Sequence, residues 1–149
     1  MLQRGVTWFL LADGRRARVL AEPRRGAPLA ELGDWNLAIG ADELYDIQDR
    51  PPRSHDRLGS SRHAMDQGRN LHEEEEARFL DRVAQRLEAA EARKEFDHLV
   101  IAAPPRALGI LRETLAAPVK ACIRAEIDKD LIDEDAATLC AQLTGLLRG

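Results

Sequence analysis

Carboxylates near the ends of predicted elements are the side chains of this chain best suited to catalysis. Asp13 follows a predicted strand, Asp97 opens another, and Glu73 and Glu76 lie at the start of a predicted helix. Two-metal nucleases gather carboxylates in this way around their ions. Asp13, however, follows the C-terminal end of its strand, whereas Asp97 precedes a strand expected to run parallel to it. We therefore expect these two carboxylates to lie far apart, and the sequence predicts no nuclease site.

The histidines and the common catalytic motifs point the same way. His55, His63 and His72 have no common zinc spacing, and Glu76 stands where an HExxH motif would need its second histidine. The sequence contains no GxSxG, P-loop or GxGxxG motif. We therefore expect no metal, no cofactor and no catalytic residue, and we favour a protein that is not an enzyme.

Arginines supply the best candidates for a binding surface. Arg15 and Arg16 lie at a predicted hairpin turn. A long predicted loop and its end carry five more, namely Arg50, Arg53, Arg57, Arg62 and Arg69. Guanidinium groups bind phosphate bidentately, and a loop can adapt to the shape of RNA. Our hypothesis is that these seven arginines contact RNA phosphates, with the ribosome or a structured RNA as the partner. The alternative is a mobile, solvated loop that binds nothing.

The charged segment Asp128-Lys129-Asp130 has two interpretations. Asp side chains commonly shape turns and cap helices through bonds to nearby backbone N–H groups. The same three charges could instead present a surface to a protein partner. The sequence leaves both interpretations open.

Three strands are predicted before the long loop. Val6–Ala12 is apolar on both faces, as a central strand is, and Asp13-Gly14 is a strong turn signal. Arg16–Glu22 alternates between small apolar and larger side chains, which predicts a second strand. Leu29–Trp35 is a weaker third strand, interrupted by Gly33 and expected at an edge. Residues 36–70 show no periodicity and predict a long loop, either mobile or functional.

The rest of the chain alternates helix and strand. Leu71–Glu95 has helical periodicity, with Asn70 and Glu73 at capping-box spacing and four glutamates, Glu73 to Glu76, expected in its first turns. Asp97–Ala103 predicts a central strand, and the two prolines after it begin a helix. Val119–Ile127 predicts an edge strand, and Asp133–Leu147 a final helix capped by an Asp.

These elements assemble into an α/β fold of order βββαβαβα. Right-handed crossovers place the two later strands parallel to the first, which gives the sheet order 3-2-1-4-5. Three antiparallel strands are then followed by two parallel ones, with three main helices. This is a ribonuclease-H-like topology. The two strands that are apolar on both faces occupy its centre.

Composition sets the broad class. The 149 residues are 44% hydrophobic and 32% charged with a net charge of −4, as expected for one soluble globular domain spanning 1–149. The short apolar run near the N-terminus ends in Asp-Gly and predicts a strand rather than a signal peptide, and no run is long enough to cross a membrane. Cys122 and Cys140 are expected to be small buried thiols. The predicted location is the cytoplasm.

Four segments together resemble the bacterial host-attachment protein family. They are TWFLLADGRRARVLAE, EEARFLDRVAQRLEAA, FDHLVIAAPPRALGILRETL and AEIDKDL, in this order and spacing. The family is similar in turn to the middle domain of archaeal and eukaryotic release factors. In those proteins a Gly-Gly-Gln loop leads into the long helix. The matching segment here, Asp66–Leu71, lacks that motif, so the resemblance does not imply peptidyl-tRNA hydrolysis.

Taken together, the residues and the resemblance predict a non-catalytic cytoplasmic factor associated with RNA or the ribosome. The alternative prediction is a protein-interaction module that affects attachment to the host or to surfaces indirectly.

Overall fold

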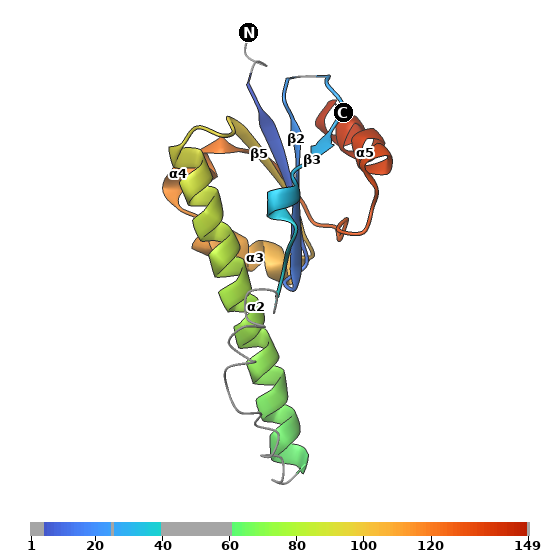
Figure 1. Cartoon of the computed structure of the whole chain (residues 1–149). Coiled ribbons are helices and arrows are strands. Elements are labelled where there is room, and N and C mark those ends of the chain that lie inside the picture. The colour runs from blue at the N-terminus through green and yellow to red at the C-terminus, as the bar shows by residue number, and fades with distance from the viewer. Residues whose placement is uncertain (1–4, 25, 40–60, 149) are drawn as a thin grey trace.

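A mixed β-sheet with helices on both faces forms the body of the protein (Figure 1). The computed structural model describes the backbone of residues 5–24, 26–39 and 61–148, and the side chains of residues 5–24, 26–39 and 71–143. Within these ranges the strands are β1 (Thr7–Ala12), β2 (Arg16–Glu22), β3 (Ala30–Glu31), β4 (Leu37–Ala38), β5 (His98–Ala102) and β6 (Ile123–Ile127). The sheet order is β3-β2-β1-β5-β6, with β4 also paired to β2. The predicted strand order is confirmed.

The central position of β1 and β5 follows from their sequences. Every residue of β1 is buried, and β5 is buried from Leu99 to Ala102. β1 pairs antiparallel with β2 and parallel with β5, so it lies between two neighbours and must be apolar on both faces. The edge strand β6 alternates between half-buried and exposed residues, as predicted for a strand with one solvated face.

The helices divide unequally between the two faces. Helices α2 (Ser61–Ala92), α3 (Pro105–Thr114) and α4 (Ala117–Cys122) cover one face, and α5 (Ala136–Arg148) covers the other (Figure 1). The first face packs around an aromatic group in which Trp8 lies 5.4 Å from Trp35 and 4.9 Å from Phe96 between ring centroids. On the second face, Phe9, Leu11 and Leu20 meet Leu139 and Leu143 of α5. No helix in the described ranges has the length and apolarity that crossing a membrane requires.

Helix α2 begins ten residues earlier than predicted. Residues 61–70, assigned to the loop, are helical, so Asn70 is no N-cap and the Glu73–Glu76 run lies in the middle of the helix. The helix dipole therefore does not explain that acidic run. Periodicity gave no signal here because residues 61–70 have no apolar stripe in the sequence. The predicted loop also contained β4, and residues 40–60 lie outside the described residues.

Two further boundaries differ from the predictions. The predicted third strand Leu29–Trp35 is shortened to β3, because a 3-10 turn at Gly33–Trp35 follows it and turns Trp35 into the core. The first half of the predicted strand Val119–Ile127 is helix α4, which has a proline in its first turn. Its residues alternate in polarity like a strand, but a proline suits a helix start, and β6 begins only at Ile123.

Candidate functional site

Two of the predicted binding segments lie within the described residues, and both are at the end of the sheet where its parallel strands finish. Arg15 and Arg16 follow β1, and Asp128-Lys129-Asp130 follows β6, where these parallel strands end. Ligands of open α/β sheets bind outside the carboxyl ends of the strands. The carboxyl end of the sheet is therefore the first place to look for a site.

The hairpin turn is fixed by Asp13. Its Oδ1 accepts hydrogen bonds from the backbone N–H groups of Arg15 at 2.9 Å and Arg16 at 2.8 Å. Gly14 takes the left-handed conformation with φ of 95°, and a Cβ there would lie 3.3 Å from Oε1 of Glu76. The turn thus needs glycine twice, once for its backbone and once for the approach of α2.

Consecutive arginines hold the two faces of the molecule. Arg15 lies 4.0 Å from Glu76 of α2, which also accepts a 2.6 Å hydrogen bond from Arg106 of α3. Arg16 reaches the other face, where its guanidinium donates to both carboxylate oxygens of Asp133 at 2.9 and 3.3 Å. That hydrogen-bonded ion pair raises the pKa of Arg16 and lowers the pKa of Asp133.

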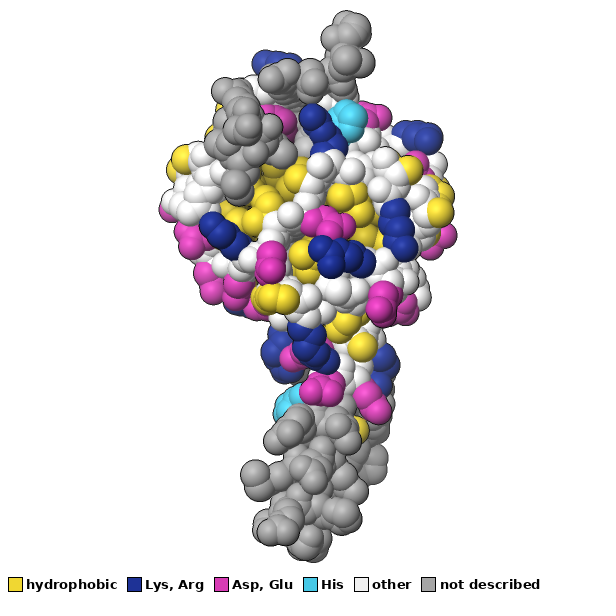
Figure 2. Space-filling view, turned by 180° about the vertical axis from the view of Figure 1, so that it is seen from behind, with side chains coloured by type: hydrophobic (Ala, Val, Ile, Leu, Met, Phe, Trp, Pro, Cys, Tyr) yellow, Lys and Arg dark blue, Asp and Glu magenta, His cyan; other side chains and the backbone are white. Residues whose placement is uncertain are grey.

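The charges of the ion pairs around the hairpin balance. Three cations, Arg15, Arg16 and Arg106, face three anions, Asp13, Glu76 and Asp133. Arg15 and Arg16 are each 48% exposed and therefore accessible, but a phosphate would have to compete with their carboxylates. On the face shown in Figure 2, basic and acidic side chains are also interspersed rather than gathered by sign.

Arg18, in the interior of β2, makes the densest set of polar contacts on the α5 face. Its Nε and Nη2 donate to the two oxygens of Glu31, each at 2.9 Å. Its Nη1 donates to the backbone carbonyls of Ile132 at 2.6 Å and Glu134 at 2.7 Å. The hydrogen bond between the side chains raises the pKa of Arg18 and lowers the pKa of Glu31. Arg18 thereby ties the segment before α5 to the sheet.

The segment Asp128-Lys129-Asp130 is exposed. Asp130 Oδ1 accepts from the backbone N–H of Ile132 at 3.3 Å, so it shapes the turn. It does not cap the last helix, because Asp135 does so through a 2.7 Å bond from the N–H of Thr138. That bond lowers the pKa of Asp135. Asp128 and Lys129 remain available to a partner as exposed side chains.

None of the five loop arginines has a described side chain, so their position relative to the hairpin stays a prediction. Arg50, Arg53 and Arg57 lie outside the described residues. Arg62 and Arg69 belong to the first ten residues of α2 rather than to a loop.

The carboxylates considered for nuclease chemistry are separated as predicted. In the parallel register Thr7 lies beside His98 and Leu11 beside Ala102, so Asp13 and Asp97 lie at opposite ends of the sheet. Asp97 instead accepts a 2.9 Å bond from the backbone N–H of Val6. Among the described residues, no three His, Cys, Asp or Glu side chains converge as metal ligands do. Cys122 and Cys140 are half-buried rather than fully buried, and burial raises the pKa of the Cys122 thiol.

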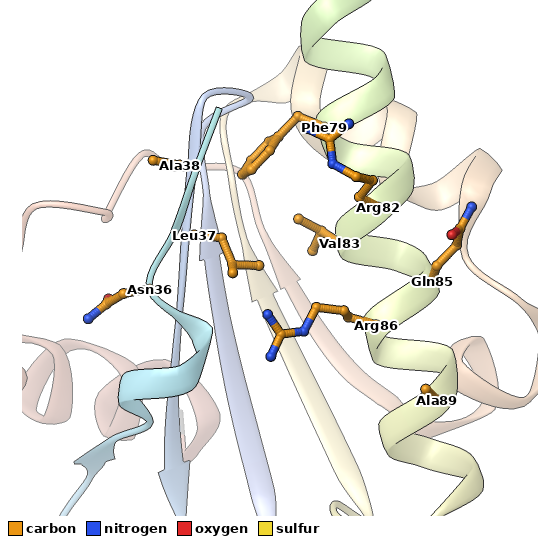
Figure 3. A pocket seen from close by; sticks show the side chains of 9 residues that line it. All are labelled: Asn36, Leu37, Ala38, Phe79, Arg82, Val83, Gln85, Arg86 and Ala89. Atoms are coloured by element: carbon orange, nitrogen blue, oxygen red, sulfur yellow. The ribbon is translucent and has the colours of Figure 1, made fainter. Parts of the chain in front are cut away.

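A pocket not foreseen from the sequence lies between α2 and the segment around β4 (Figure 3). Its volume is about 440 Å³. The described residues that line it are Asn36, Leu37, Ala38, Phe79, Arg82, Val83, Gln85, Arg86 and Ala89. The helical members recur at spacings of three and four, which is a detectable signal. The residues of the opposite wall, Asn36–Ala38, lie more than forty positions away, and nothing in the sequence links the two groups.

The sequence was also compared with known protein families. A family model described as "Protein required for attachment to host cells" matches residues 8–143. The chain belongs to this family. None of the curated proteins matches the chain. The match runs from β1 into α5, so it includes both faces of the sheet, the hairpin arginines and the pocket. The family relates the chain to host attachment and assigns no chemistry to these residues.

Proposed function

We propose that this host-attachment family member is a non-catalytic cytoplasmic factor that associates with structured RNA, with the ribosome as its expected partner. The proposal rests chiefly on the projection of α2 beyond the sheet.

The N-terminal half of α2 extends away from the body of the protein (Figure 1). The helix has 32 residues, which at a rise of 1.5 Å per residue makes it about 48 Å long. Among the described side chains of α2, Glu76 makes an ion pair with the body and Phe79 is the first that is buried, whereas Leu71 to Glu74 are exposed. The fifteen residues from Ser61 to Glu75 therefore reach about 22 Å beyond that anchor. A projecting helix of this length can enter a groove that the body cannot.

The arginines of the projection supply the RNA-binding chemistry. Arg62 and Arg69 belong to the projecting half, and Arg50, Arg53 and Arg57 precede it in the sequence. Glu73–Glu76 come after Arg69 in the same helix and repel phosphate. The proposed contact therefore lies in the part of α2 that precedes Leu71. Arg15 and Arg16 form a secondary contact, since each must exchange a carboxylate for a phosphate.

The proposed relation to release-factor middle domains is supported by the sheet. Three antiparallel strands followed by two parallel ones suit a ribonuclease-H-like fold. Residues 66–71 are helical, however, so a loop matching the Gly-Gly-Gln loop would precede Ser61 and lie outside the described residues. The whole sequence contains no Gly-Gly pair. This supports a role without peptidyl-tRNA hydrolysis.

The test is a mobility-shift titration with ribosomal RNA fragments and tRNA at several salt concentrations. A phosphate footprint predicts an affinity that falls steeply with salt. The double variant Arg62→Gln/Arg69→Gln should bind more weakly, and its slope against the logarithm of salt should decrease by about two. The matched control is Arg93→Gln/Arg124→Gln, which removes the same charge from exposed sites on the body and should bind like the unmodified chain. Absent or salt-independent binding would refute the proposal.

The second proposed function is a protein-interaction module that affects attachment indirectly. It is favoured by Leu71, a large apolar side chain that is 57% exposed on the projection, and by the exposed Asp128 and Lys129. Co-sedimentation of a tagged chain separates the two functions. Enrichment with the 50S or 70S fractions supports RNA association. Exclusive recovery with a non-ribosomal protein supports the interaction module, and its loss in Leu71→Ala would assign the contact to α2.

A further inference from the structure

Strand β6 forms an open edge of the sheet. It pairs with β5 on one side, and no described strand pairs with its other side. At the opposite edge, β3 and β4 have two residues each, whereas β6 presents five. Backbone N–H and C=O groups along an unpaired edge are a template for another strand. Of the two described edges, β6 is therefore the better template.

The outward-facing backbone groups of β6 belong to Arg124 and Glu126. The carbonyl of Ile127 accepts a 3.0 Å hydrogen bond from the N–H of Ala103, which follows β5, so Ile127 faces that strand. Neighbouring residues of a strand direct their backbone groups to opposite sides, which places those of Glu126 on the open edge. Arg124 is the extra residue of a bulge in the pairing with β5, so it has no partner there either.

The sequence of this strand is complementary to itself. When two copies pair antiparallel about Ala125, Arg124 lies opposite Glu126 of the second copy, and the two-fold axis repeats the pair. Centring the pairing on Arg124 or on Glu126 would instead set two like charges directly opposite each other, which is destabilising. The charges therefore favour the register about Ala125 over both of its neighbours.

Both charged side chains have room for this contact. Arg124 is exposed, and it makes no hydrogen bond or ion pair with the described part of the chain. Glu126 accepts a 2.6 Å bond from Arg112 of α3 through Oε1, and its Oε2 takes part in no described contact. Arg124 of a second copy would extend this ion pair into a row of three alternating charges. Such networks contribute more than isolated surface pairs.

We propose that β6 pairs antiparallel with β6 of a second copy of this chain, centred on Ala125, and joins the two sheets. Charges on an edge discourage pairing with unrelated strands, and here the same charges favour one partner. Five residues from each chain make a small interface, so the dimer is weak and depends on concentration. Each copy keeps its own α2, so the proposed RNA contact does not require the pairing.

Sedimentation equilibrium of the full chain between about 1 μM and 1 mM tests the proposal. We expect a monomer–dimer equilibrium that shifts toward the monomer as salt screens the exposed charges. Hydrogen exchange at the two ends of this range should show the amides of Arg124 and Glu126 protected in the dimer and not in the monomer. A monomer throughout, or a dimer in which these two amides exchange freely, would overturn the proposal.

Charge reversal tests the register. Arg124→Glu alone, or Glu126→Arg alone, sets like charges opposite each other at both symmetric pairs and should weaken the dimer about tenfold or more. A mixture of the two variants restores both pairs of opposite charge, so it should form a heterodimer as tight as the unmodified dimer. The control Lys129→Glu reverses an exposed charge just beyond the strand and should leave the dimer unchanged.

Thermal melting checks that each variant is folded. Glu126→Arg also breaks the bond from Arg112, whereas Arg124→Glu breaks no described contact and gives a result even if the first variant unfolds. The double variant Arg124→Glu/Glu126→Arg should dimerise like the unmodified chain, because both pairs are merely exchanged. Unchanged dimerisation of Arg124→Glu, or a mixture of the two folded variants that stays monomeric, would overturn the proposed register and its partner.

Discussion

The two faces of the sheet are held by different forces. Among the described side chains, the α2–α3–α4 face buries 22 residues, including Trp8 and the rings of Trp35 and Phe96 that contact it. The α5 face buries eight, and the segment leading into α5 is attached by the guanidinium groups of Arg16 and Arg18. Apolar burial is nondirectional and insensitive to pH, whereas hydrogen-bonded ion pairs are directional and depend on protonation. The first face is therefore expected to set global stability, and the second to open locally.

The largest expected effect is on the aromatic face. Phe96 is 1% exposed and packs on Trp8. Phe96→Ala should reduce the free energy of unfolding by about 3–5 kcal/mol, because it removes a buried ring and leaves a cavity. Urea denaturation measures the change. As a control, Leu71→Ala alters an exposed side chain on the projection and should stay within about 0.5 kcal/mol. A similar loss in both variants would contradict the assignment of the core.

The next effect concerns the attachment of α5. Arg18→Met keeps the aliphatic stem but leaves the carbonyls of Ile132 and Glu134 without their donor. The expected cost is about 1–3 kcal/mol. Hydrogen exchange should show faster exchange across α5 and unchanged exchange in the buried part of α2. Arg112→Met, which removes one ion pair to Glu126, should accelerate neither. Equal acceleration of both helices would show that the faces are not independent.

A substitution at Gly14 tests the hairpin turn from which Arg15 and Arg16 reach the two faces. Gly14→Ala forces a side chain into a left-handed conformation, which costs about 1–2 kcal/mol, and brings its Cβ to 3.3 Å from Glu76. Gly26→Ala is the matched control, since its φ is 87° but nothing lies within 4 Å of the added Cβ. Thermal denaturation of both variants isolates the contact with Glu76 as the difference between them. Equal melting temperatures would mean that Glu76 simply moves aside.

The smallest expected effect is on the acid side of the stability profile. In the folded chain the pKa values of Glu31, Asp133 and Asp135 are lowered, by Arg18, by Arg16 and by the N–H of Thr138 respectively. The unfolded state therefore takes up protons first as the pH falls. The stability from these groups is complete above their unfolded pKa of about 4 and is lost below it.

Urea midpoints measured between about pH 3 and 6 check this dependence. The double variant Glu31→Gln/Asp133→Asn should show a flatter profile than the unmodified chain. Hydrogen exchange of α5 at the two ends of this pH range should place the acid-sensitive opening on the α5 face. Identical profiles in the two proteins would remove the proposed electrostatic attachment.

The sequence was sufficient to predict those elements whose apolar pattern is set by burial. The unbroken apolar runs of β1 and β5 predicted their central positions, and with the crossover rule they led to the observed sheet order. The sequence was insufficient where its pattern is absent or too short. Residues 61–70 are helical but have no apolar stripe in the sequence. The alternation of Val119–Cys122 resembles a strand, although these residues end a short helix.

In the candidate sites too, the sequence indicated some residues but not the partners that hold them. Arg15 and Arg16 were recognised from their type and the turn, but their partners Glu76 and Asp133 lie 61 and 117 positions away. Glu76 was interpreted as a helix-dipole residue because the start of α2 was placed too late. Arg86 was unremarkable in the sequence, and only the position of Trp35 and Asp34 gives it a fixed orientation.

The hairpin tip has a consequence for how this chain can change in length. Arg15 and Arg16 are consecutive in the sequence, yet their side chains reach opposite faces of the sheet. One inserted residue between Asp13 and Arg16 would exchange the faces that the two side chains reach, and it would also displace the glycine beneath Glu76. The turn at Gly26 has no such neighbour. Natural insertions, peptide tags and engineered fusions should therefore be tolerated at the second turn and rejected at the first.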